Sequence, residues 1–154
     1  MDLFFYGTLM DADVRGLVLG PKATGLRLEP ARLHGFRRMA KRHSTAPVIV
    51  PRPGVWLPGL LARGLRAGQI LRLRHFEGRN YRLCACRVRL GSGEIQPAMV
   101  YRGAGHIPVR RMEWRLASWQ RRHKRGFLRR MAPWIAVYRE ARYSGRGRPR
   151  WITR

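Results

Sequence analysis

Short runs of apolar, β-branched and aromatic residues, ended by glycine or proline, recur through the first two thirds of the chain. Runs of this length bounded by turn residues predict buried or half-buried strands. We expect Glu29-Pro30 and residues 51–54 to interrupt strands, because proline and glycine favour turns. Gly59, inside one run, predicts a bulge or a close approach of the backbone. The expected strands cover residues 2–6, 23–28, 31–37, 46–50, 55–62, 81–90 and 95–101.

Apolar residues at helical spacing predict three helices. The first follows a cap at Asp11 or Asp13 and runs through Leu19. The second covers residues 67–76 and ends at Gly78. The third covers residues 109–131, and its expected inward-facing stripe consists of Met112, Leu116, Trp119 and Phe127.

The order of these elements predicts the fold class. Many short strands with a few helices, and no regular alternation of the two, favour an α+β domain built on a small curled sheet or barrel. A chain of 154 residues suits one such domain. We expect the domain to span residues 1–138, and we expect residues 139–154, which are basic and have little apolar surface to bury, to form a mobile tail.

Basic side chains outnumber acidic ones 33 to 8, which gives a formal net charge of +25. Of the basic residues 30 are arginines and 3 are lysines, so part of the excess is a compositional bias toward arginine. The excess gathers at the C-terminal end, where residues 110–154 hold 15 basic and 2 acidic side chains. This region is either a solvated face with a tail or an arm that binds nucleic acid or an anionic surface nonspecifically.

Several classes of protein are disfavoured. No uninterrupted apolar stretch approaches the roughly 18 residues of a membrane-spanning helix, and Asp2 directly after Met1 is unlike the basic start of a signal peptide, so we expect a cytoplasmic protein. Cys84 and Cys86 lie two apart on an expected strand while the histidines are scattered singly, which favours small core residues over a metal site. No serine-nucleophile, phosphate-loop or dinucleotide signature is present.

Glu77 is a candidate for chemistry because it is one of only eight acidic residues and its immediate neighbours, Phe76 and Gly78, carry no charge. One interpretation is a carboxylate at a helix end that pairs with an arginine. The other is a partly buried glutamate whose pKa is raised by desolvation and which works as a general base. Its position alone favours the ion pair, because structural ion pairs imitate functional sites.

Tyr6, Gly7, Thr8 and Leu9 form a second candidate feature, a glycine loop at the end of the first expected strand. Gly7 lets a ligand approach consecutive backbone N–H groups, and such a concavity suits a carboxylate or a phosphate. By itself the tetrapeptide is an ordinary strand-to-helix turn.

Taken together, these segments resemble the gamma-glutamylcyclotransferase-like family. The family's strand, Tyr-Gly-Thr-Leu loop and helix are similar to LFFYGTLMDADVRGLVLG at residues 3–20. Its Leu-x-x-Phe-Glu-Gly signature with a following tyrosine is similar to LRHFEGRNYRL at residues 73–83. Further similar segments are ARLHGFRR at residues 31–38, PGLLARGL at residues 58–65 and AMVY at residues 98–101. The resemblance covers about the first two thirds of the chain, in the family's order.

The resemblance implies a small mixed β-barrel flanked by helices, and a cyclotransferase that needs no metal or cofactor. The glutamate would accept a proton from the α-ammonium of a γ-glutamyl substrate. The freed amine would attack the γ-carbonyl, close the 5-oxoproline ring and expel an amine or amino acid. The glycine loop would hold the α-carboxylate end through its backbone amides. The implied residues are Glu77 as the catalytic base and, for substrate binding, Tyr6, Gly7, Thr8, Leu9, Tyr81 and Tyr101.

A second hypothesis keeps this fold without the catalysis. The protein would then be a non-catalytic module that binds nucleic acid or an anionic surface through its arginine-rich region, residues 110–154. Under the first hypothesis its partner is a small γ-glutamyl compound. The sequence leaves open which group departs from that compound and which oligomeric state the protein adopts.

Overall fold

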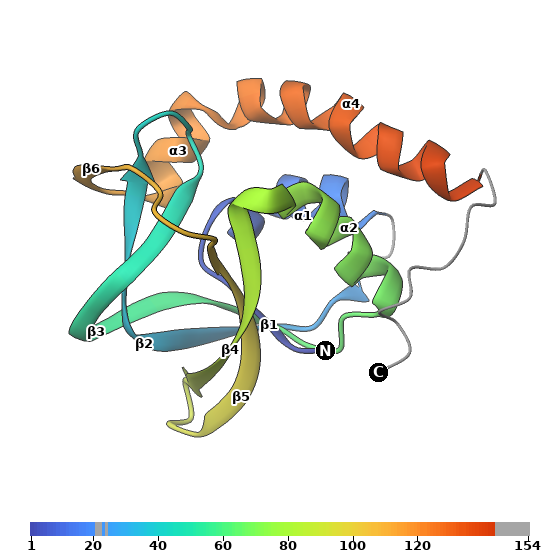
Figure 1. Ribbon diagram of the computed structural model, residues 1–154. Coiled ribbons are helices and arrows are strands. Elements are labelled where there is room, and N and C mark those ends of the chain that lie inside the picture. The colour runs from blue at the N-terminus through green and yellow to red at the C-terminus, as the bar shows by residue number, and fades with distance from the viewer. Residues whose placement is uncertain (21–22, 24, 144–154) are drawn as a thin grey trace.

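The computed structural model describes residues 1–20, 23 and 25–143 of the chain. Five β-strands form a closed barrel. The strands of the sheet are β1 (Leu3–Phe5), β2 (Leu28–Lys41), β3 (Pro47–Ala62), β4 (Tyr81–Leu90), β5 (Ile95–Gly103) and β6 (Val109–Glu113). Their order is β3-β1-β5-β4-β2, the pairing of β2 with β3 closes the barrel, and β6 extends it beyond β2 (Figure 1). Because β1 and β5 are parallel while the other pairs are antiparallel, the barrel is mixed, as predicted.

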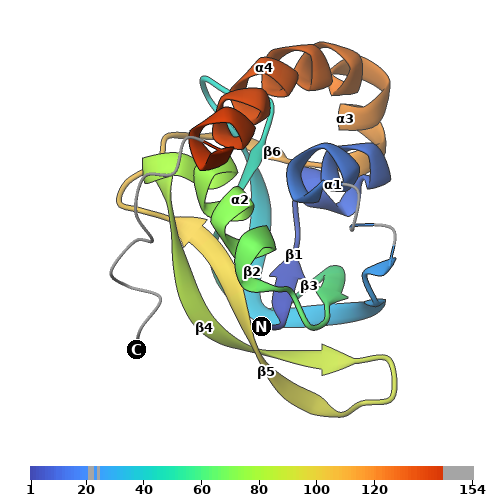
Figure 2. The ribbon, with the colours of Figure 1, turned by 90° about the vertical axis from the view of Figure 1, so that its right-hand side faces the viewer.

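The α-helices of the described chain gather on one side of the barrel (Figures 1 and 2). They are α1 (Ala12–Leu19), α2 (Ala67–Glu77), α3 (Leu116–Arg122) and α4 (Lys124–Tyr143), and the short 3-10 turns η1 (Thr8–Met10) and η3 (Gly78–Asn80) adjoin α1 and α2. The long α4 lies across α1 and α2 and contacts both. None of the helices in the described ranges combines the length and the apolar character needed to cross a membrane.

Apolar side chains form two adjoining cores. The barrel interior is filled by residues that include Phe4, Leu33, Leu57, Val88 and Val100. A second core, which we call the seam core, lies between barrel and helices and includes Leu3, Phe5, Val14, Leu73, Trp119 and Phe127. Since successive side chains of a strand point to opposite faces, β1 serves both cores, and every residue of this strand is buried. Strand β1 therefore ends inside the protein, at the seam.

The predicted limits of the first helix are confirmed, and those of the second hold to within one residue, because α2 ends at Glu77 and not at Phe76. Asp11 caps α1, where its carboxylate accepts hydrogen bonds from the backbone N–H groups of Asp13 (3.0 Å) and Val14 (3.2 Å). Gly78 follows α2 with a φ of 63°, a backbone conformation that favours glycine. The chain therefore leaves α2 directly after Glu77.

The prediction that Glu29-Pro30 separates two strands is wrong. Strand β2 passes through both residues without interruption. At Pro30 the strand pairs with β3, and pairing with β4 begins only at Ala31. A residue without an N–H group is tolerated at such an open edge.

The turn predicted at residues 51–54 is also wrong, since β3 continues through it. Instead, the register between β2 and β3 shifts: His34 pairs with Trp56, whereas Phe36 pairs with Pro51. The extra residues of β3 form an exposed bulge opposite Gly35, whose φ is 82°. The proline and glycine signals therefore mark a bend within a long strand and not its end.

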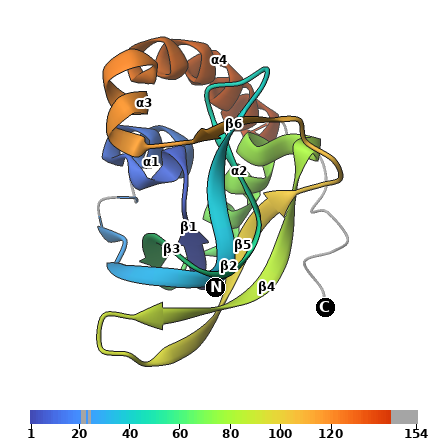
Figure 3. The ribbon, with the colours of Figure 1, turned by 90° about the vertical axis from the view of Figure 1, so that its left-hand side faces the viewer.

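The long helix predicted over residues 109–131 is wrong. Its first part, Val109–Glu113, is strand β6, which pairs with β2 through Met39 and Lys41 (Figure 3). The available edge of β2 satisfies the backbone hydrogen-bonding groups of this segment, and local periodicity carries no information about such a distant partner. The remainder forms α3 and α4 with a break between them at His123.

Most of the expected inward stripe is nevertheless confirmed. Trp119 and Phe127 are buried in the seam core, and Leu116 packs against it. Met112 is the exception at 57% exposed, because it lies on β6 and not on a helix.

Two further boundaries differ from the expectation. Helix α4 runs to Tyr143, and the rest of the expected tail, residues 144–154, lies outside the described residues. Of the described residues in the 23–28 segment, Leu28 alone belongs to a strand.

Gly59 makes the close approach that the sequence predicts, since a Cβ there would collide with the carbonyl oxygen of Phe5 and the ring of Phe4. We expect Gly59→Ala to lower the free energy of unfolding by roughly 3 kcal/mol, because neither neighbour can move freely inside the core. Gly16→Ala is the matched control: its Cβ would meet nothing within 4 Å, so helix α1 should gain about 0.5–1 kcal/mol. Urea unfolding of both variants measures the difference, and equal midpoints would contradict it.

Candidate active site

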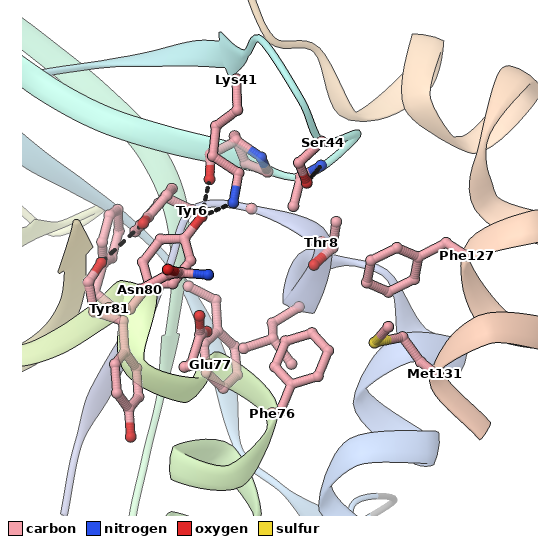
Figure 4. Close-up of a pocket in the computed structure, with 17 residues that line it drawn as sticks. Tyr6, Thr8, Lys41, Ser44, Phe76, Glu77, Asn80, Tyr81, Phe127 and Met131 are labelled. Carbon is pink, nitrogen blue, oxygen red and sulfur yellow. Dashed lines mark hydrogen bonds between the residues drawn. The ribbon is translucent and has the colours of Figure 1, made fainter. Parts of the chain in front are cut away.

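A cavity of about 260 Å³ opens at the seam, where β1 ends. The residues after β1, the end of α2 and the start of β4 supply its walls, and α4 closes it from the helical side (Figure 4). Its volume lies just below the range of roughly 300–1,000 Å³ typical of small-molecule sites, which favours a ligand of amino-acid size. The cavity brings together all the residues that the sequence singled out, namely Tyr6, Gly7, Thr8, Leu9, Glu77, Tyr81 and Tyr101.

The glycine loop forms a tight turn directly after the C-terminal end of β1. The backbone N–H of Met10 donates to the carbonyl of Gly7 (2.9 Å), and the Arg38 guanidinium donates to the carbonyl of Tyr6 (2.9 Å). The N–H groups at the start of such a turn have no acceptor within it. A Cβ on Gly7 would lie 2.9 Å from Cγ of Pro47, so the close packing at this position requires glycine.

Glu77, the last residue of α2, faces this loop across the cavity (Figure 4). Although its side chain is only half-buried, desolvation raises the pKa of its carboxyl from 4.5 to about 8, and the positive charge of Lys41 partly opposes the rise. Within the described ranges, no ion pair includes Glu77. The structure thus favours the partly buried carboxyl with a raised pKa over the surface ion pair.

Hydrogen bonds hold the aromatic wall in place. The ammonium of Lys41 donates to the hydroxyl of Tyr81 (2.8 Å), which donates to the carbonyl of Pro47 (2.8 Å). The hydroxyl of Tyr6 donates to the carbonyl of Tyr101 (2.8 Å). Desolvation raises the pKa of Tyr6 and Tyr81, and that of Tyr101 to about 12, so all three phenols stay protonated near neutral pH.

Part of the cavity wall consists of residues that were not predicted from the sequence. Lys41 is the most consequential omission, because it is the cation that acts on Glu77, and burial lowers its own pKa. Its rarity was a usable signal, since the chain has only three lysines among 33 basic residues. The other missed residues are Ser44, Ala46, Pro47, Phe76, Asn80, Phe127 and Met131, together with Phe4 and Phe5 of β1.

The two cysteines are partly buried and pack against the core of the barrel interior, as expected for small core residues. In the part of the chain that the structure describes, no group of three or more histidine, cysteine, aspartate or glutamate side chains lies close enough to hold a metal ion.

A family model supports the resemblance. Residues 3–121 match the model described as gamma-glutamyl cyclotransferase, AIG2-like, which covers the barrel, the cavity's loop and Glu77. The chain belongs to the gamma-glutamyl cyclotransferase, AIG2-like family. The matched range ends within α3, so Phe127 and Met131 of α4, which line the cavity, lie beyond it.

Known proteins agree with the membership in this cyclotransferase family. The chain is 27% identical over 129 residues to AIG2-like protein A of Arabidopsis thaliana, which covers 82% of this chain and 76% of that protein. The solution structure of an Arabidopsis thaliana protein superposes with a TM-score of 0.61 at 24% identity, over 84% of this chain and 87% of that one. A structure titled gamma-glutamyl cyclotransferase has a TM-score of 0.59 at 16% identity, over 70% of this chain and 68% of that one. The two structures show the same fold.

The raised pKa of Glu77 predicts a pH-dependent effect on stability. Because the folded protein holds this proton up to about pH 8 and an ordinary glutamate releases it near 4.5, stability contributed by the neutral carboxyl is lost as the pH rises through this window. We therefore expect Glu77→Gln to melt several degrees above the native chain at pH 9, and close to it at pH 4. Thermal melts from pH 4 to 9 check this. The exposed Glu94→Gln is the control, and a Glu77→Gln difference that stays constant with pH would contradict the prediction.

Proposed function

We propose that this protein is a gamma-glutamyl cyclotransferase that releases 5-oxoproline from a γ-glutamyl amine or peptide. The observation that carries the proposal is that a desolvated carboxyl, Glu77, and the glycine loop line the same small cavity. Membership in the family supports the class of reaction.

The cavity offers complementary groups for a γ-glutamyl unit. The N–H groups of the turn at Gly7 and Thr8 would bind its α-carboxylate, and the nearby positive charge of Lys41 would favour that anion. The apolar side chains of Phe76 and Phe127 would cover its methylene groups. Binding at both ends would fold the substrate so that its amine lies against its own γ-carbonyl.

Ring closure then requires only proton transfers and a change of bonds at one carbon. The Glu77 carboxylate takes a proton from the α-ammonium, and the amine attacks the γ-carbonyl carbon to form the new C–N bond. The bond from that carbon to the departing nitrogen breaks. Overall the ring nitrogen loses two protons and the departing nitrogen gains two, and Glu77 relays a proton between them. A loop N–H group would stabilise the oxyanion that forms on the γ-carbonyl oxygen, because the hydroxyls of Tyr6 and Tyr81 already donate to the carbonyls of Tyr101 and Pro47.

The acidity of Glu77 suits this transfer. Its pKa of about 8 lies far closer to that of an ammonium group than the 4.5 of an ordinary glutamate does, so taking the proton from the α-ammonium costs less. Orientation of the amine against the γ-carbonyl lowers the activation barrier further, since intramolecular reactions gain up to about 7–11 kcal/mol from favourable orientation.

Removing the base tests the proposed role. We expect Glu77→Gln to lower kcat for 5-oxoproline release by about 10²–10⁴-fold, because the amide keeps the shape of the side chain but cannot accept the proton. The native rate should rise with pH up to about 8 as the carboxylate forms. A panel of γ-glutamyl amino acids and γ-glutamyl amines, assayed by chromatography of 5-oxoproline, measures both effects. Glu94→Gln should retain full activity, and an equally active Glu77→Gln would refute the assignment.

A second candidate function, binding of polyanions, is favoured by one feature of α3 and α4. Arg121, Arg125 and Arg129 are exposed, and no ion pair among the described residues neutralises them. Lys124, in contrast, is held by Asp11 and Asp13 at 2.8 and 2.7 Å. The three arginines form a cationic face that nucleic acid or an anionic surface could use without involving the cavity.

If this face binds nucleic acid, exchanging Arg121, Arg125 and Arg129 together for glutamine should weaken binding to a single-stranded oligonucleotide. Each lost phosphate contact should flatten the slope of log K against log salt by about 0.7. The control is the same exchange at Arg32, Arg52 and Arg87, which are exposed on β2, β3 and β4. This control variant loses the same amount of positive charge. Fluorescence anisotropy across a salt series compares the two, and equal losses would show attraction by net charge alone.

A further inference from the structure

A second cavity, of about 510 Å³, adjoins the first. Lys41 and Ser44 line both, so the two cavities share a wall at the end of β2 and the segment that follows it. Trp119 lines the second cavity, and its ring packs edge-on against Phe127 of the first, with centroids 5.2 Å apart. The second cavity is therefore the neighbouring space that a molecule too long for the first would reach beside Lys41 and Ser44.

The rim of this second cavity is strongly cationic. Arg110, Arg115 and Arg122 line it in addition to Lys41. The one carboxylate in its wall, Glu113, lies 3.8 Å from the guanidinium of Arg115. With four cationic side chains and one anionic side chain, the cavity attracts anions and repels cations.

Two almost completely buried tryptophans form the floor of the second cavity, and the exposed side chain of Met112 adds apolar surface to its wall. The two tryptophans, Trp114 and Trp119, lie with ring centroids 6.1 Å apart. The indole N–H of Trp114 donates to the carbonyl of Thr45 (2.8 Å). The indole nitrogen of Trp119 is buried and has no hydrogen-bond partner in the described part of the chain. Because an indole can only donate, this buried group requires an acceptor.

From these contacts we propose that the second cavity receives the departing part of the substrate and selects leaving groups that carry an anionic group beside an apolar one. The inference rests on the proposed cyclotransferase function. An anionic oxygen would lie among the arginines, apolar atoms would lie against Met112 and the accessible edges of the two tryptophan rings, and a cationic amine would be repelled. Since these contacts are remote from the reacting carbon, the selection acts mainly through KM.

Two substrates that differ by one carboxylate test the selection. We expect γ-glutamylphenylalanine to have a kcat/KM about tenfold or more above that of γ-glutamylphenethylamine, chiefly through a lower KM. A cationic analogue, γ-glutamylcadaverine, should be the poorest of the three. Equal kcat/KM values, or a preference for the cationic compound, would overturn the inference while leaving the proposed reaction intact.

Paired variants locate the effect. Exchanging Arg110 and Arg122 for glutamine should reduce the preference to about threefold or less, because the loss falls mainly on γ-glutamylphenylalanine; Arg115 is kept so that Glu113 retains its partner. Exchanging Arg125 and Arg129, which are exposed on α4 and line neither cavity, removes the same charge and should leave the preference as it was. An equal loss in both variants would show a long-range charge effect and refute the subsite.

Binding to Glu77→Gln separates this inference from the proposed reaction. Calorimetric titration of that variant should show the same ranking of the three compounds without turnover. Preferential binding of γ-glutamylphenylalanine, combined with no 5-oxoproline release by the native chain, would refute the reaction and keep the binding site. Absence of both binding and release would refute the two together.

Discussion

Desolvation of one half-buried carboxyl group between barrel and helices is the interaction on which the candidate site depends. Glu77 ends α2 at the seam, where loss of water raises its pKa to about 8 and Lys41 limits the rise. The same residue on an exposed helix end would keep an ordinary pKa and would be too weak a base to take a proton from an ammonium group near neutrality. The seam core, more than the residue type, therefore makes Glu77 suitable as a base.

Strand β1 is the element that brings the parts of the site to that seam. It pairs with β3 on one side and β5 on the other, and the absence of a side chain at Gly59 lets β3 pack directly on its backbone. The end of β1 positions the glycine loop. The parallel pairing of β1 with β5 places Tyr101 of β5 beside that end, in the wall of the cavity. Segments distant in sequence thus meet because one short, fully buried strand lies between them.

The structure also divides the arginine excess into parts with different consequences. Arg110 and Arg122 line a cavity that adjoins the candidate site, whereas Arg125 and Arg129 lie on the exposed side of α4. Arg38 has a third role: its guanidinium donates to the carbonyl of Tyr6 and so holds the glycine loop in place. Net charge treats these residues alike, and only their positions distinguish a specific role from general attraction of anions.

The sequence by itself determined the features that depend on neighbouring residues: the cap at Asp11, the end of α2 at Glu77, most strands, and the loop and glutamate of the family resemblance. It misplaced the continuous β2 and β3 and the strand β6, because these depend on pairing with distant segments. It also missed Lys41, Ser44, Phe127 and Met131 in the cavity wall. Tertiary structure alone decided these, since the side chains that surround a cavity, and hence the pKa inside it, are set by which segments pack together and not by the residues beside them in the chain.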